Sequence, residues 1–146
     1  MKYIFFYLSF FLLINTSLLY SQSSKQWLKR EFRHIVINDK LWIGTPNGLY
    51  QYHPDEDIWT VYGTHTGLPA NDIKQLQWDG EFLIVATSEG VALGDINLNK
   101  WLSYNAENGL PSNNVLSLTF QEDYIWIGTD KGAARYDKLI QEWESF

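Results

Sequence analysis

The densest group of chemically capable side chains lies at residues 126–137, WIGTDKGAARYD, whose threonine, aspartates, lysine and arginine suggest a binding loop. The pattern recurs, because residues 42–50 read WIGTPNGLY and residues 84–92 read IVATSEGVA. The shared threonines, Thr45, Thr87 and Thr129, stand 42 residues apart. A site is usually written once, whereas a structural module is repeated. These residues therefore indicate a structural turn and not a catalytic loop.

Other groups capable of catalysis or metal binding are scattered. His34, His53 and His65 share no repeat position, and the acidic segment that begins with His53, residues 53–57, is typical of a solvated turn. Residues 95–106 begin like a calcium loop but lack its required glycine and final glutamate. We therefore predict no catalytic residue, no metal site and no cofactor, and expect that the chain is not an enzyme.

The repeat that carries the turn extends along most of the chain. Trp59, Trp101 and Trp143 align at the same period of 42, and GLP-x-N at residues 67–71 aligns with residues 109–113. In the second unit the apolar pattern and turn residues predict strands at 73–78, 82–87, 91–95 and 100–104. No segment has an apolar face at helical spacing long enough to compete.

The second strand of each unit, at residues 41–43, 82–85 and 124–127, is a continuous apolar run, so both faces of each sheet must be covered. Without helices, sheets must cover sheets. Four-stranded antiparallel sheets repeating every 40 to 45 residues are typical of β-propeller blades. The prediction is an all-β fold of three four-stranded antiparallel blades of 42-residue period, at about 32–62, 73–104 and 115–146, forming an incomplete ring. A β-solenoid is the alternative, although its coils are usually about half as long.

The first 21 residues have the charged start, apolar middle and small-residue end of a secretory signal, and we predict cleavage after Ser21. An uncleaved membrane anchor is the alternative. The segment 22–146 is then a partial β-propeller with 10 Lys+Arg (11 less Lys2) and 17 Asp+Glu, a net charge of −7. This charge argues against nucleic acid or an anionic membrane surface as the main partner, and we expect no membrane contact apart from the signal segment. With no cysteine, packing alone must hold the fold.

The stretches LWIGTPNGL, YIWIGTDKGAARYD and NGLPSNNV resemble the two-component regulator propeller repeat, found in the exported sensor regions of bacterial hybrid histidine kinases. The second unit departs from the pattern, with Ile84 and Ala86 where the family has Trp and Gly. The resemblance implies a periplasmic or extracellular input module that senses a ligand, often a glycan fragment, ahead of a membrane helix and a kinase. It also implies that this chain is a fragment of a longer protein.

On a repeated scaffold, function is expected where the repeats differ. The candidate ligand-binding residues lie in the turns between second and third strands and in the links between blades: Asn47, His65, Ser88, Glu89, Glu107, Asp130 and Lys131. Both loop sets are expected at the same end of the blades. The ligand would be a glycan or another nutrient-derived compound. The alternative is a structural or protein-interaction propeller of an exported surface or secretion-linked protein, with no small-molecule ligand.

Blade stacking leads to two further expectations. The outer-strand tryptophans Trp59, Trp101 and Trp143 should pack against neighbouring blades. Three blades should leave two unmatched faces, one near Ile35 and Trp42 and one near Trp126 and Trp143, which further blades in cis or a second copy would cover.

Overall fold

The computed structural model describes residues 33–37, 40–95 and 100–146. The chain divides into the units Met1–Glu31 and Phe32–Phe146, and every described residue lies in the second. The predicted signal segment, residues 1–21, is outside the described residues. In the described part, no helix has the length and apolar character needed to span a membrane.

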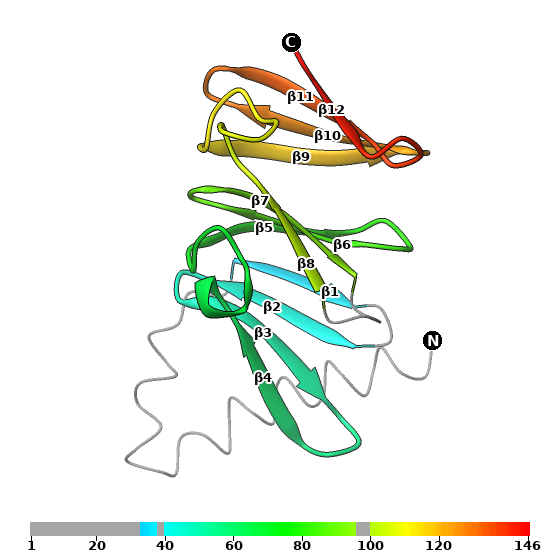
Figure 1. Cartoon of the computed structure of the whole chain (residues 1–146). Helices are drawn as coiled ribbons and strands as arrows, with labels where there is room; N and C mark the ends of the chain where they lie inside the picture. The colour runs from blue at the N-terminus through cyan, green and yellow to red at the C-terminus, as the bar shows by residue number, and fades with distance from the viewer. Residues whose placement is uncertain (1–32, 38–39, 96–99) are drawn as a thin grey trace. The chain divides into compact units, whose positions relative to one another are not determined.

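The described chain forms three antiparallel sheets of four strands, each with its strands in chain order (Figure 1). We call them blades 1, 2 and 3. Blade 1 contains β1 (His34–Ile37), β2 (Leu41–Thr45), β3 (Gly48–His53) and β4 (Ile58–Tyr62). Blade 2 contains β5 (Ile73–Trp78), β6 (Leu83–Thr87), β7 (Gly90–Asp95) and β8 (Lys100–Tyr104). Blade 3 contains β9 (Val115–Gln121), β10 (Tyr124–Thr129), β11 (Gly132–Asp137) and β12 (Glu142–Ser145).

Burial along the strands explains this architecture. All five residues of β2 and all five of β6 are buried, so both sheet faces are covered at these strands, as their apolar runs predict. The outer strand β8 has no fully buried residue. The fold is that of β-propeller blades, and the predicted fold class is confirmed.

The blades pack face to face. We call the face of a blade toward the next blade in the chain its forward face, and the opposite face its backward face. One core cluster joins Trp42, Leu49 and Tyr62 of blade 1 to Leu83, Val85 and Ala92 of blade 2. A second joins Ile84, Val91 and Leu93 of blade 2 to Ile125, Ile127 and Ala134 of blade 3. Side chains that alternate along the middle strands of blade 2, β6 and β7, thus belong to two different interfaces.

The outer-strand tryptophans of blades 2 and 3 do pack against the preceding blade, as predicted. The Trp101 ring lies 5.5 Å from the ring of Tyr62 in blade 1, between centroids, and the Trp143 ring lies 5.2 Å from that of Tyr104 in blade 2. Trp59 is half-buried, and its ring lies 4.9 Å from Tyr52 within its own blade.

The expected positions of the unmatched faces were partly wrong. Trp42 is 1% exposed because it faces blade 2, and Trp143 faces blade 2 from blade 3. Trp126 fits the expectation, because its ring stacks on Phe146 of the same blade, with 5.9 Å between the ring centroids. The side chain of Ile35 is outside the described residues. Strand periodicity separates the two faces of a sheet, but does not say which of them meets which neighbour.

Candidate functional site

Two sets of loops meet at one end of the blades. The first set contains the turns between second and third strands, and the second contains the links 63–72 and 105–114. Backbone hydrogen bonds join the sets, from Ser88 N to Asp72 O at 3.1 Å and from Asp130 N to Asn114 O at 3.3 Å. We call this end the loop-tip face.

Each turn is built on a threonine and a glycine. The Thr87 hydroxyl donates to Gly90 O at 2.9 Å and accepts from Glu89 N at 3.2 Å. Thr45 and Thr129 make the same two bonds in their own turns. The register pairs Thr87 with Gly90, so the loop between the strands has two residues. Gly90 has a φ of 130°, a backbone angle that residues other than glycine rarely adopt. The repeated motif is structural.

The links are equally well defined. Leu68 and Leu110 are 3% and 4% exposed and belong to the two interblade cores. The side-chain oxygen of Asn71 accepts from Thr64 N at 2.9 Å, and that of Asn113 accepts from Ala106 N at 2.8 Å. The first link also forms a short 3-10 turn, Thr64–Thr66. Both links are therefore rigid supports for the side chains they carry.

The predicted ligand-binding residues lie on this support. Six of the seven are exposed and the seventh, Ser88, is half-buried; the exposed six are Asn47, His65, Glu89, Glu107, Asp130 and Lys131. The structure ties Glu89 to the following link, since Asn113 Nδ2 donates to Glu89 Oε2 at 3.3 Å. The turn of blade 2 and the link to blade 3 thus form one continuous polar surface.

Asp130 is held in a similar way. The Ser112 hydroxyl donates to its carboxylate and lowers the pKa of this group, with further lowering by Asn114 and the Lys131 charge. Ser112 is buried, so the acid is anchored to the link beneath it. A deprotonated carboxylate fixed in this way is a hydrogen-bond acceptor and not a proton donor at neutral pH.

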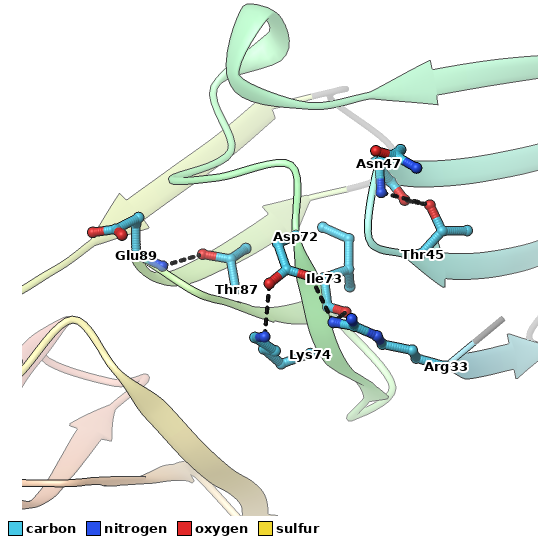
Figure 2. A network of polar contacts seen from close by, with 9 residues as sticks. Arg33, Thr45, Asn47, Asp72, Ile73, Lys74, Thr87 and Glu89 are labelled. Atoms are coloured by element: carbon cyan, nitrogen blue, oxygen red, sulfur yellow. Dashed lines mark hydrogen bonds and ion pairs between the residues drawn. The ribbon is translucent and has the colours of Figure 1, made fainter. Parts of the chain in front are cut away.

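An ion-pair network was not foreseen from the sequence (Figure 2). Asp72 binds Arg33 through one carboxylate oxygen at 2.5 Å and Lys74 through the other at 2.6 Å. Lys74, and then Arg33, lower the pKa of Asp72. The repeat could have indicated it, because Arg33, directly before β1, and Lys74, in β5, occupy equivalent positions. The Arg33 pair joins blade 1 to the start of blade 2.

The chemistry available here is hydrogen bonding. His53, outside this face, has its Nε2 2.9 Å from the Thr60 hydroxyl. Across the described residues, no group of three or more His, Asp or Glu side chains is placed to hold a metal ion. The backbone amide of Asn47 donates to the Thr45 hydroxyl, and that of Glu107 donates to the side-chain oxygen of Asn105, so these bonds fix the backbone that carries each side chain.

Comparisons with known proteins agree with this architecture. Residues 109–131 match the family described as two component regulator propeller. The chain is similar to the extracellular domain of the hybrid two component system BT3049 from B. thetaiotaomicron, at 23% identity over 80% of this chain, with a TM-score of 0.66. It is also similar to the extracellular domain of BT4673 from the same organism, described as a one component system, at 26% identity over 79% of this chain, with a TM-score of 0.64.

A computationally designed protein, Ika4, shares the fold at 11% identity, with a TM-score of 0.59, over 80% of this chain and 71% of its own. The chain spans only 18% and 16% of the two extracellular domains. No curated protein matches its sequence significantly. The chain thus resembles the two component regulator propeller repeat in sequence, and sensor extracellular domains in fold.

Proposed function

We propose that this chain is an exported ligand-sensing segment, part of the input module of a two-component sensor, and that it binds its ligand at the loop-tip face. The observation that carries the proposal is that a repeated backbone scaffold presents a different set of side chains in each blade. The Thr–Gly turn and the Leu–Asn link repeat, while the residues they present differ from blade to blade. Similarity to two extracellular sensor domains supports the same role.

The charges of this face favour a neutral, hydroxyl-rich ligand such as an oligosaccharide. Glu89, Glu107 and Asp130 are acidic, while Lys131 supplies the single formal cation among the seven residues. Carboxylates and amides accept hydrogen bonds from sugar hydroxyls, whereas an anionic ligand would be repelled. The ligand class therefore follows from the excess of acceptors.

The test is binding of a panel of neutral and anionic oligosaccharides to the chain 22–146, measured by calorimetry and by the shift in melting temperature. We expect a neutral sugar to bind, and Glu89→Gln to weaken binding about tenfold, the effect of losing roughly 1.4 kcal/mol. The matched control is Glu56→Gln, because Glu56 is an exposed acid in the turn between β3 and β4, at the opposite end of blade 1.

Equal effects of the two variants would contradict a site at the loop-tip face. Failure of every sugar, together with capture of a defined protein partner, would favour the alternative of an interaction propeller. We also propose that the chain has no hydrolase or lyase activity, which incubation of the bound sugar followed by product analysis would test.

A further inference from the structure

Three aromatic rings lie against one another in the interface between blades 1 and 2, and Trp78 packs against the same core. Trp42 and Tyr62 come from the forward face of blade 1, and Trp101 comes from the backward face of blade 2. Their ring centroids lie 5.5 Å (Trp42–Tyr62), 5.5 Å (Tyr62–Trp101) and 6.3 Å (Trp42–Trp101) apart. A fourth position, cross-strand from Trp101, is Gly94.

The interface between blades 2 and 3 uses the same four positions differently. Here the forward face supplies one ring, Tyr104, and the backward face supplies two, Tyr136 and Trp143. The centroids lie 5.6 Å (Tyr104–Tyr136), 5.2 Å (Tyr104–Trp143) and 5.0 Å (Tyr136–Trp143) apart. The remaining position, equivalent to Trp42, is Ile84, which is 0% exposed.

At these four positions the two interfaces therefore follow one rule, three rings and one smaller residue, and the smaller residue can stand on either side. The reason is volume. A Cβ atom added at Gly94 would collide with the Trp101 ring, so a ring at this fourth position has no room. Interiors are packed to a fixed density, and an extra large side chain forces its neighbours to move.

The forward face of blade 3 carries two rings at the positions of Trp42 and Tyr62. Trp126 and Phe146 are stacked, with an interplanar angle of 27°. Phe146 is 61% exposed, whereas its equivalent Tyr62 is 7% exposed. The Arg135 guanidinium lies over the Trp126 ring, 5.5 Å from its centroid, and pairs with Glu144 at 2.6 Å. This face thus resembles the forward face of blade 1 before blade 2 is added.

We propose that the forward face of blade 3 binds a further propeller blade that supplies one ring, a tryptophan at the position of Trp101, with glycine at the position of Gly94. Such a blade would complete three rings with Trp126 and Phe146. A second copy of this chain does not fit the rule, because its blade 1 would bring both Tyr52 and Trp59. The two similar extracellular domains are long enough to hold more blades, since this chain spans 18% and 16% of them.

The test is to append a fourth blade to the chain 22–146. Residues 63–104 and residues 105–146 are each one period long, so a copy of either can follow Phe146 in register. The first copy brings glycine and tryptophan, and the second brings tyrosine and tryptophan. The chain has no cysteine, so Ala133→Cys, on the same forward face as its repeat equivalents Leu49 and Val91, gives a single thiol whose labelling rate reports docking.

We expect the copy of 63–104 to slow labelling at least tenfold relative to the three-blade chain, and the copy of 105–146 to protect much less. Trp126→Ile should reverse this order, because it recreates the combination of Ile84 with Tyr136. Glu81→Cys, in an exposed turn of blade 2, is the control thiol and should label at one rate throughout.

Equal protection by both copies, or an equal effect of Trp126→Ile on both, would overturn the proposal. So would a three-blade chain that dimerises in solution and protects the Ala133→Cys thiol unaided, because blade 1 of a second copy would then be the occupant. Urea unfolding of each chain identifies any variant that fails to fold. For that case Trp126→Leu provides a second, milder version of the exchange.

Discussion

Replacing Trp101 by alanine should remove much of the contact between blades 1 and 2. The ring lies against Tyr62 and Trp42 of blade 1 and over Gly94 of its own blade. Aromatic pairs contribute about 0.5 to 1.5 kcal/mol each beyond area burial, and truncation of a buried tryptophan costs about 3 to 5 kcal/mol. Because Trp101 is half-buried, we expect a loss near the lower limit, about 3 kcal/mol.

The assay is urea unfolding of the chain 22–146, followed by far-ultraviolet circular dichroism. Trp126→Ala is the matched control, since Trp126 is also half-buried but its ring contacts, Phe146 and Arg135, lie within blade 3. We expect it to cost about 1 kcal/mol, close to the range of surface substitutions. If Trp101→Ala cost no more than this control, the ring would not join the blades, and the three-ring rule would lose its basis.

Three other substitutions test the polar contacts. Asp79 has no exposed side-chain surface, pairs with Lys138 at 3.2 Å and accepts from two backbone amides, so Asp79→Ala should cost about 3 to 5 kcal/mol; a loss below about 1 kcal/mol, the range of surface changes, would refute the stabilising role of this carboxylate. Thr87→Val removes both turn bonds and should lower the free energy of unfolding by about 1 to 3 kcal/mol, and an unchanged urea midpoint would refute the structural role of the motif. The pKa of Asp72 is lowered in the fold, so its stabilising effect is present above the ordinary carboxyl pKa and is lost as pH falls through the folded value; Asp72→Asn should flatten the acid limb of a stability–pH profile, and an identical limb would contradict the ion pairs.

The repeat period predicted the strands because each position of the motif has one physical task. Thr87 closes its turn by the bonds expected of it, Leu68 fills the space between blades, and Asn71 bonds the backbone of its link. These contacts are local consequences of residue type. They could be predicted from the sequence because each motif occurs at least twice in the chain.

The sequence did not predict which residues of one blade contact which residues of the next. Trp42 and Trp126 occupy one repeat position, yet one is buried between blades and the other is half-buried on the last forward face. The Asp79–Lys138 pair joins residues 59 apart with no repeat signal. Gln75 is a similar case, because its side-chain amide donates to Leu118 O at 3.3 Å and accepts from Leu118 N at 3.2 Å. Its equivalent in blade 3 is Ser117, whose side chain is shorter. The contact is therefore not repeated, and the repeat could not indicate it.

The placement of the two links connects ligand binding at the loop-tip face with the packing between blades. His65 and Glu107 stand three residues before the buried Leu68 and Leu110, and each turn between them is closed by a backbone bond, from Leu68 N to Gly63 O and from Leu110 N to Asn105 O. A displacement of His65 or Glu107 would therefore be carried by a short hydrogen-bonded turn to the leucine between the blades. A ligand held by these links would be coupled to blade stacking, and the coupling is reciprocal. Any change that loosens the stack would lower the affinity of the ligand by the same factor by which the ligand tightens it.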